Sequence, residues 1–330
     1  MKNPSKFPIL SLPIVAIEEI LKSALPFDII NFSKTSSKCK RVVQYCTSMR
    51  RHHVFVLMAR NIVIGFQGNG FQYGYRMICD KSEAGIKKKF INHSDFEISS
   101  VFCNNRIDKL KECSGYIKDV LKTEFHRLVF NIGRYPYGNK EIIDWFKSQS
   151  PVIHHCSLTG RKVLIEDVIY FLEQLKFTES LYCKFGIKEV KEVLPISISV
   201  KQLIILHANW ISLETLMKFE CVQITLCRSI FTDSDLNVFL KSWIASNSNK
   251  DLQYLRLHDV NSWNLEVVFK GIHVEGEDPE QRLRQHIRAN IQEVFEHKGS
   301  VIRTIDGTIA DIYIVGQMGD FVMEIRGNSN

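Results

Sequence analysis

The run His154, His155 and Cys156 is the densest cluster of metal-ligand side chains in the sequence. Imidazole and thiolate groups are ligands that zinc prefers in proteins. The apolar residues around the run predict a strand, and adjacent residues of a strand point to opposite faces of the sheet. Because the three side chains cannot converge on one ion without a bulge, we interpret the run as part of a packed strand.

Other patterns of catalytic residues are missing from the sequence, which contains no H-E-x-x-H, G-x-S-x-G, Walker loop or C-x-x-C. The glycines at 65, 68, 70 and 74 fit no phosphate-binding pattern, and we interpret them as hairpin glycines. The paired acids at 18–19 and 166–167 are neighbours on predicted helices and do not face each other. We therefore expect no independent enzyme, no metal site and no cofactor.

The composition is that of an ordinary globular protein of 330 residues, with 45% hydrophobic and 24% charged residues. No stretch has the ~18 uninterrupted apolar residues of a membrane span. The apolar start at 7–17 contains two prolines and is a poor signal peptide. The nine cysteines form no C-x-x-C pair, which favours reduced thiols in the cytosol or the nucleus.

The charge of the chain is concentrated at its start. Residues 1–60 hold ten basic and three acidic residues, which accounts for the whole net charge of +7. A basic head on a neutral body indicates that the head meets something acidic, either an acidic protein or a nucleic acid.

This head is predicted to form three short helices. The first begins at Pro13, the second at Pro26, and the third near Ser36 and Ser37. The first helix is apolar on most of its circumference, and ~45 residues cannot bury faces on all sides of their own helices. Some of this apolar surface must be buried against the rest of the chain or against a partner. A helix-turn-helix that reads DNA is an alternative, but it leaves the apolar excess unexplained.

The body of the chain begins with extended segments at 52–80, followed by a weakly patterned region with a predicted helix at 107–121. From residue 125 the pattern Φ-x-x-Φ-x-Φ recurs, and helical patterns lie between the copies. The middle residues of these copies are Leu128, Cys156, Leu181, Leu203, Val222 and Leu255. Strand then helix at a period in the twenties predicts an irregular leucine-rich-repeat-like αβ solenoid, and an α/β domain without repeats is the alternative.

The end of the chain predicts an antiparallel meander over 301–325 with an Asp306–Gly307 turn. Pro279 is predicted to start a basic helix through Arg282, Arg284 and Arg288.

The order of the N-terminal motifs resembles an F-box, over residues 7–46. The matching features are Leu12–Pro13, Leu25–Pro26, Asp28–Ile30 and the block Phe32-Ser-Lys-Thr-Ser36. The style is closest to the nematode group that also has a type 2 F-box-associated domain. The resemblance implies binding to the Skp-type adaptor of a cullin ubiquitin ligase, whose acidity would suit the basic head. Cys39 stands where many F-boxes have Trp.

The resemblance also implies which side chains face the adaptor, on the first two helices. These residues are Leu12, Pro13, Ile17, Ile20, Leu21, Ile29, Ile30 and Phe32.

Residues 190–265 resemble the type 2 F-box-associated domain, through Phe231–Trp243 and Leu252–Leu257. The role that this implies is the capture of a protein substrate. In the predicted solenoid, alternate strand residues face an open concave surface. The outward positions that we predict to bind substrate are Arg127, Asn131, Tyr182, Gln202, Gln223, Tyr254, Arg256 and His258. Val129, His155, Ser157 and Thr225 share this face. The alternative for each of these residues is that it is an ordinary polar residue facing solvent, with no role in binding.

The sequence therefore predicts an α/β chain with three parts: an F-box at 1–50, a β-rich region at 51–124, and a repeat domain at 125–330. The expected function is that of the substrate-recognition subunit of a Skp–cullin–F-box ubiquitin ligase, with no membrane partner. The alternative is a nucleic-acid-associated regulator that uses the basic N-terminal helices.

Overall fold

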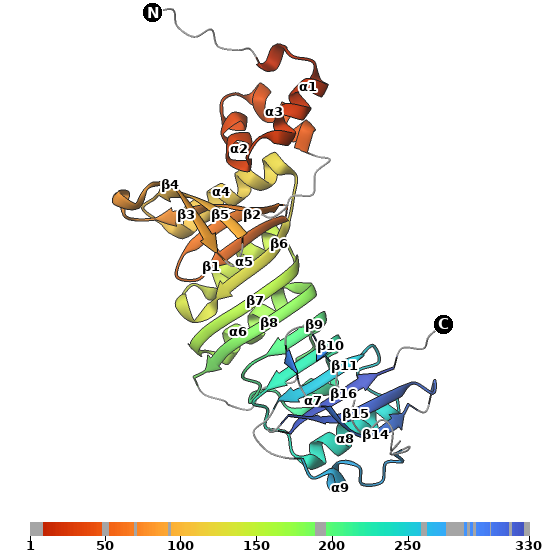
Figure 1. The fold of residues 1–330 in the computed structure, drawn as a ribbon. Helices are drawn as coiled ribbons and strands as arrows, with labels where there is room; N and C mark the ends of the chain where they lie inside the picture. The colour runs from red at the N-terminus through yellow and green to blue at the C-terminus, as the bar shows by residue number, and fades with distance from the viewer. Residues whose placement is uncertain are drawn as a thin grey trace, which may run out of the picture. The chain divides into compact units, whose positions relative to one another are not determined.

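The computed structural model describes residues 9–47, 53–68, 71–91, 94–188, 196–258, 263–274, 287–288, 291–292, 295–303, 305–316 and 319–326. The chain divides into two compact units, Met1–Val129 and Phe130–Asn330. Figure 1 shows the three helices of the head followed by strands and helices that alternate along the chain. The predicted α/β class with three N-terminal helices is therefore confirmed.

The first unit begins with a short 3-10 helix and the three predicted helices. They are η1 (Ile9–Ser11), α1 (Ile14–Ser23), α2 (Pro26–Lys34) and α3 (Ser37–Thr47). Pro13 directly precedes α1 and Pro26 is the first residue of α2. A proline is harmless there because the first N–H groups of a helix have no intrahelical partner.

Five strands of the first unit follow these helices. They are β1 (His53–Met58), β2 (Ile62–Gly68), β3 (Phe71–Ile78), β4 (Gly85–Ile91) and β5 (Ser94–Phe102), with η2 (Lys81–Glu83) between β3 and β4. The order is β1-β2-β3-β5-β4, in which β3 and β5 are parallel and the other pairs antiparallel.

Two of the predicted hairpin glycines lie inside strands instead. Gly65 of β2 pairs with Phe55 of β1 on one side and with Gly74 of β3 on the other. A Cβ on Gly65 would lie 2.2 Å from the Phe55 ring and 2.6 Å from the carbonyl oxygen of Tyr73. Glycine is needed at this position because the Phe55 ring occupies the space of a side chain.

Helix α4 (Arg106–Leu121) joins the two parts of the first unit. The Asn105 side chain caps it by accepting the N–H groups of Ile107 and Asp108. Its buried residues are Leu110, Ser114, Ile117, Val120 and Leu121. Helices α2 and α3 pack on α4, which in turn packs on β2 and β3. The head is therefore one layer of a larger unit. Strand β6 (Phe125–Asn131) contains the unit boundary.

The second unit alternates strands and helices, then ends in a meander. Its first elements are η3 (Ile132–Arg134), α5 (Asn139–Gln149), β7 (Val152–Val163), α6 (Ile165–Gln174), β8 (Lys176–Ile187), β9 (Ser199–Ile205), α7 (Leu213–Met217), β10 (Glu220–Cys227), α8 (Asp233–Ile244), β11 (Tyr254–His258) and α9 (Leu265–Val268). The remaining strands are β12 (Ile287–Arg288), β13 (Ile291–Gln292), β14 (Phe295–Ile302), β15 (Ile309–Val315) and β16 (Asp320–Ile325).

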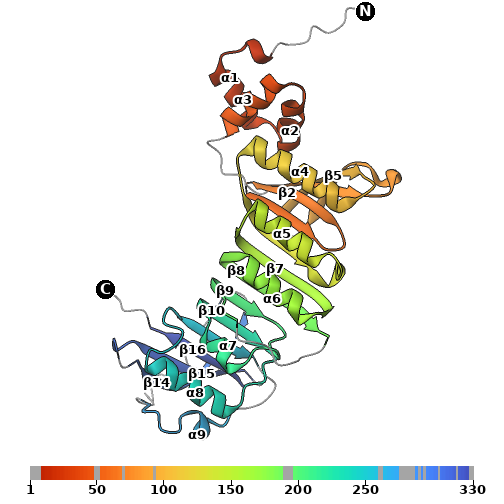
Figure 2. The ribbon, with the colours of Figure 1, turned by 180° about the vertical axis from the view of Figure 1, so that it is seen from behind.

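Strands β7 to β11 lie side by side in chain order and are all parallel. Figures 1 and 2 show α5, α6, α7 and α8 on the same face of this sheet. One row of buried residues crosses it through paired positions: Cys156, Leu181, Leu203, Ile224 and Leu255. The row corrects one predicted repeat, because Ile224 and not Val222 pairs with Leu203. Val222 is half-buried, and Cys221 takes the buried position before it.

The meander pairs β14, β15 and β16 antiparallel and joins β11 through β16. The predicted meander is therefore confirmed, and Gly307 of its first turn has φ +68°. The helix predicted from Pro279 lies outside the described residues, except that Arg288 belongs to strand β12.

Within the described residues, no helix is long and apolar enough to cross a membrane. The same residues contain no group of three or more His, Cys, Asp or Glu side chains that could hold a metal ion.

Candidate functional site

The eight residues that the F-box resemblance placed toward an adaptor differ in exposure. Ile17, Leu21, Ile29 and Ile30 are buried, with exposures of 1–5%. Leu12 and Phe32 are half-buried, while Pro13 and Ile20 are exposed. The four buried side chains fill the interior between the three helices and their neighbours. Four of the eight predicted residues, Leu12, Pro13, Ile20 and Phe32, are therefore at least partly accessible.

Other apolar side chains of the three helices are exposed. They are Ile14 and Val15 at the start of α1, Leu25 before α2, and Tyr45 on α3. Val15 is 66% and Tyr45 60% exposed. The sequence shows that residues 14–21 are mostly apolar. Which side of α1 stays exposed to solvent, however, depends on where α2, α3 and α4 lie. Sequence reasoning missed these four residues for that reason.

The basic side chains of the head divide into paired and exposed ones. Lys22 lies 3.1 Å from Glu18 and 2.6 Å from Glu19, and Lys40 pairs with Asp119 of α4. Lys38 and Arg41 are exposed on α3. Part of the head's charge is thus neutralised within the unit, and exposed basic side chains remain on α2 and α3.

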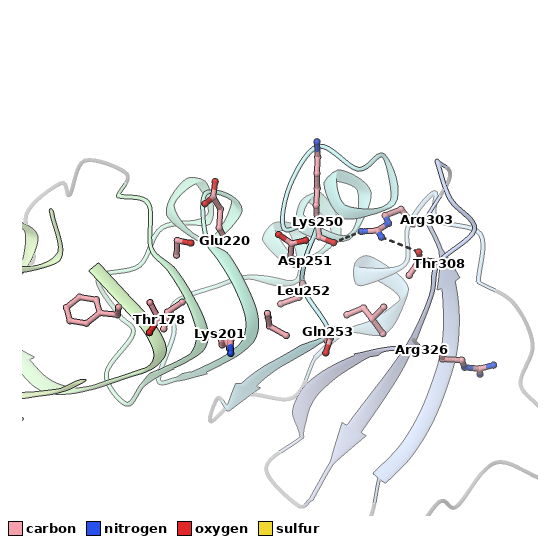
Figure 3. A pocket seen from close by; sticks show the side chains of 15 residues that line it. Thr178, Lys201, Glu220, Lys250, Asp251, Leu252, Gln253, Arg303, Thr308 and Arg326 are labelled. Carbon is pink, nitrogen blue, oxygen red and sulfur yellow. Dashed lines mark hydrogen bonds between the residues drawn. The ribbon is translucent and has the colours of Figure 1, made fainter. Parts of the chain in front are cut away.

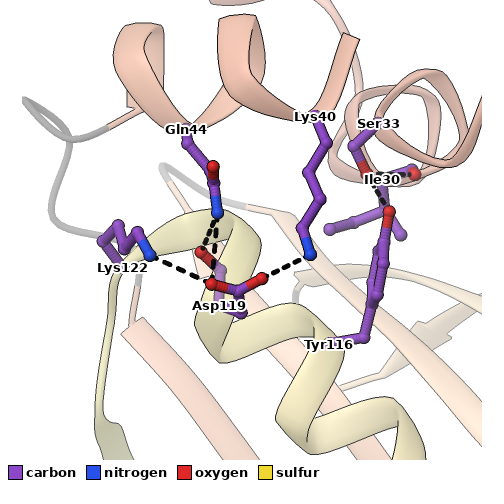
Figure 4. A network of polar contacts seen from close by, with 7 residues as sticks. All are labelled: Ile30, Ser33, Lys40, Gln44, Tyr116, Asp119 and Lys122. Atoms are coloured by element: carbon purple, nitrogen blue, oxygen red, sulfur yellow. Dashed lines mark hydrogen bonds and ion pairs between the residues drawn. The ribbon is translucent and has the colours of Figure 1, made fainter. Parts of the chain in front are cut away.

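A polar network holds α3 against α4 (Figure 4). Gln44 Nε2 donates to the backbone oxygen of Asp119 at 3.0 Å and to its Oδ1 at 3.1 Å. Lys40 and Lys122 pair with the same carboxylate. Their hydrogen bonds, that of Lys40 first, hold the pKa of Asp119 below its ordinary value. The network fixes the orientation of α3 on the unit.

Aromatic contacts hold α2 against the sheet and α4. The Phe27 ring packs edge-on against Tyr75 at 4.9 Å and Tyr73 at 5.7 Å between ring centroids. The hydroxyl groups of Ser33 and Tyr116 lie 2.9 Å apart (Figure 4). One side of the head is therefore buried against the rest of the unit, while other apolar residues of the head stay exposed.

In the second unit, the predicted outward positions of three central strands are accessible. Gln202 and Gln223 are exposed, and Tyr182 is half-buried beside Ile204. Gln202 pairs directly with Gln223 across β9 and β10. Asn131 is half-buried, and Arg127 is exposed on the part of β6 that belongs to the first unit.

At the C-terminal end of this face, the predicted outward residue Tyr254 is half-buried. Tyr254 packs against a buried cluster of Tyr313, Val315 and Val322. Arg256 pairs with Val322 across the strands. Strand β16 therefore continues the sheet beside β11, and side chains of the meander on this face are buried next to Tyr254.

Two more of the predicted substrate-binding residues are held by the meander. The carboxylate of Asp320 is buried and accepts from Arg256 Nη2 at 2.6 Å. His258 Nδ1 lies 2.7 Å from the same oxygen. Their hydrogen bonds are therefore used inside the unit, and we assign both residues a role in fixing β16.

A cleft of about 630 Å³ lies where β8, β9 and β10 begin (Figure 3). Three of its four basic side chains, those of Lys201, Arg303 and Arg326, have ion-pair partners. Arg303 donates to the backbone oxygen of Lys250 at 2.9 Å and pairs with Asp306 at 2.7 Å. Arg326 pairs with Asp311 at 2.6 Å. We assign this cleft no ligand because its cations hold the surrounding loops together.

The predicted packed strand at 154–156 is confirmed. Cys156 is buried, while His154 lies 2.9 Å from Thr178 Oγ1 and His155 lies 2.8 Å from Ser180 Oγ. The side chains have separate partners and form no common site.

Comparison with known proteins identifies the head. Residues 9–51 match the family model of the F-box domain, which includes α1, α2 and α3. The chain is an F-box protein. Residues 191–257 match a second family model, described as F-box associated. In this F-box protein the second match includes β9, α7, β10 and α8, the strands and helices next to the Gln202–Gln223 pair.

A stretch of 69 residues of this F-box protein is 35% identical to the E3 ubiquitin-protein ligase hecw-1 of Caenorhabditis elegans. The match covers 21% of this chain and 6% of that protein, so the chain spans a small part of its relative's length. No solved structure matches the chain.

Proposed function

We propose that this F-box protein is the substrate-recognition subunit of a Skp–cullin–F-box ubiquitin ligase. The F-box binds a Skp-type adaptor, and through it a cullin, and the second unit recruits a protein substrate. F-box proteins are generally non-catalytic adaptors, and we assign the chain no reaction of its own. The observation that carries the proposal is the exposed apolar surface of the F-box helices.

Five large apolar side chains of the head are exposed, and we propose that they contribute to this surface. We call the set Ile14, Val15, Ile20, Leu25 and Tyr45 the exposed F-box residues. Complete burial of one such side chain contributes roughly 1.5–3 kcal/mol, and partial burial contributes less. The set is sufficient for the apolar centre of a protein interface. Lys38 and Arg41 on α3 would steer an acidic adaptor toward this surface.

Adaptor binding is tested with two matched variants. Val15→Asp places a charge on the proposed surface, and Ile230→Asp does the same at an equally exposed residue of the second unit (65%). We expect Val15→Asp to weaken binding of the purified Skp-type adaptor about tenfold or more, a loss of ~1.4 kcal/mol, in isothermal titration calorimetry. Ile230→Asp should bind like the native chain.

Equal affinities for both variants would contradict the surface assignment. Absence of adaptor binding by the native chain, together with binding to duplex DNA that weakens steeply with salt, would favour the nucleic-acid alternative.

We also propose that β7 to β11 form an irregular leucine-rich-repeat-like solenoid whose helix-free face binds the substrate. Supporting this are the chain-order parallel strands, the helices on one face, and the shared buried row. The open part of the face is near Tyr182, Gln202 and Gln223. Because Tyr254 packs against the buried cluster of Tyr313, Val315 and Val322, we place substrate contacts on β8, β9 and β10.

The substrate surface is tested by proximity labelling with the full chain. We expect Gln202→Arg with Gln223→Arg to remove a set of labelled proteins while the adaptor stays labelled. The control Lys218→Glu changes an exposed residue on the helix side of the unit. The same labelled set for the double variant and the native chain would contradict the proposal.

A further inference from the structure

A cavity of about 550 Å³ lies inside the first unit, between the F-box helices and α4. Its volume is in the usual range for small-molecule sites. The apolar and aromatic side chains that line it come from four elements, α2, β3, β5 and α4: Ile30, Tyr75, Val101, Tyr116 and Ile117. Residues of the F-box and residues that follow it therefore share one cavity.

The charged side chains of the cavity are mostly basic. Four lysines line it, Lys34, Lys40, Lys109 and Lys111, against the two acids Glu112 and Asp119. Both acids are already neutralised. Lys109 Nζ lies 2.7 Å from Glu112, and Asp119 pairs with Lys40 on the wall shown in Figure 4. The lining is left with an excess of positive charge.

Lys34 is the clearest source of this excess. Within the described part of the chain it has no ion-pair partner, and its ammonium lies 5.7 Å from the centroid of Tyr75 and 5.5 Å from that of Tyr116. A cation held over two rings keeps its charge at the cavity. An anion in the cavity would meet Lys34 without first displacing a carboxylate.

A second observation concerns Tyr75, which is 8% exposed. Its hydroxyl is buried and has no hydrogen-bond partner among the described residues. A buried hydroxyl without a partner costs free energy of roughly 1–3 kcal/mol. Burial also raises the pKa of the Tyr75 phenol, so the group stays protonated and able to donate. A ligand oxygen would satisfy it.

We propose that this cavity binds a small organic anion with an aromatic or other apolar body. The body contacts Ile30, Val101 and Ile117, and the anionic group meets Lys34 and accepts from the Tyr75 hydroxyl. Because the walls belong to α2, α3, α4, β3 and β5, the bound anion links the F-box helices to the rest of the unit. Occupancy therefore stabilises the packing of the F-box, by an amount that grows with the logarithm of the ligand concentration once this exceeds the dissociation constant.

The first experiment compares two probes with the same body. We use 2-naphthoate as the anion and 2-naphthamide as its neutral counterpart, and measure affinity for the full chain by ligand-observed NMR titration. Naphthoate should bind about tenfold more tightly than the amide. Lys34→Gln should remove this preference, and Lys38→Gln, an exposed lysine outside the lining, should retain it.

The second experiment needs no variant. Cys113 lines the cavity and is half-buried, while Cys79 is exposed and outside it. Naphthoate should slow alkylation of Cys113 by iodoacetamide and leave Cys79 unchanged, as read by mass spectrometry of the peptides. Hydrogen exchange of α2 should slow at the same time.

Equal affinity for both probes, no saturable binding of naphthoate, or protection of both cysteines alike would each overturn the proposal. None of these measurements includes the adaptor, so their result is independent of the adaptor-binding experiment.

Discussion

Replacing Phe27 by Ala tests whether the F-box helices depend on the strands behind them. Phe27 is 4% exposed on α2 and packs edge-on against Tyr73 and Tyr75 of β3. The substitution removes a whole ring from this contact and leaves a cavity.

The expected cost follows from these contacts. Phe→Ala in a buried site costs about 3–5 kcal/mol, and each edge-on aromatic pair contributes about 0.5–1.5 kcal/mol of stabilisation. We therefore expect Phe27→Ala to lower the free energy of unfolding of the first unit by about 4 kcal/mol. Phe27→Leu, which keeps most of the volume, should cost about 1.5 kcal/mol.

The assay is urea unfolding followed by circular dichroism, with hydrogen exchange of α2 and α3 as the local readout. All four tryptophans lie in the second unit, so their fluorescence serves as the control for a folded chain. A cost below 1 kcal/mol for Phe27→Ala, with unchanged exchange in α2, would refute the conclusion that the F-box is one layer of the unit.

Two further predictions concern the same unit. Asp119→Asn should lower stability near neutral pH by about 0.5–1 kcal/mol, because the carboxylate is partly exposed and its ion pairs are screened. Since folding lowers the pKa of Asp119, its contribution is present above the pKa of the unfolded carboxyl, about 3.9, and is lost as the pH falls through the lower folded value. Urea unfolding should therefore give equal stabilities for the two chains at the acid end of the series, and a difference that persists there would contradict the assignment. Gly65→Val should lower the free energy of unfolding by about 1–3 kcal/mol, because the new side chain and the Phe55 ring need the same space. The double variant Gly65→Val with Phe55→Ala should recover part of this loss in thermal unfolding. No recovery would show that another contact is responsible.

Local signals in the sequence were sufficient for several elements. Pro13 and Pro26 fix where α1 and α2 begin, because a proline fits only the first turn of a helix. The Thr232–Asp235 pattern marks the start of α8, where the structure contains both hydrogen bonds of a capping box. The recurring pattern Φ-x-x-Φ-x-Φ likewise marked Leu203 and Leu255, and both are buried in strands.

The predictions from the sequence were wrong where a residue's role depends on a strand that is not next to it in the sequence. Val222 fits the apolar pattern of a repeat, but the parallel register with β9 gives the buried position to Ile224. Register is set by neighbouring strands and cannot be read from one strand alone. The same limitation explains Gly65, whose partner Phe55 determines its role.

The sequence by itself determined that this chain has a basic, apolar three-helix head and a series of strand–helix units, because periodicity, prolines and caps act over a few residues. The tertiary structure decided which apolar residues of the head remain exposed. Helix α4 follows the head by about 60 residues and buries Ile30, while Val15 stays on the surface. It also decided how the sheet continues beyond the parallel strands, because β16 pairs with β11 and brings Asp320 to Arg256 and His258. Exposure is a property of the whole fold, since any side chain is buried only when another element of the chain covers it.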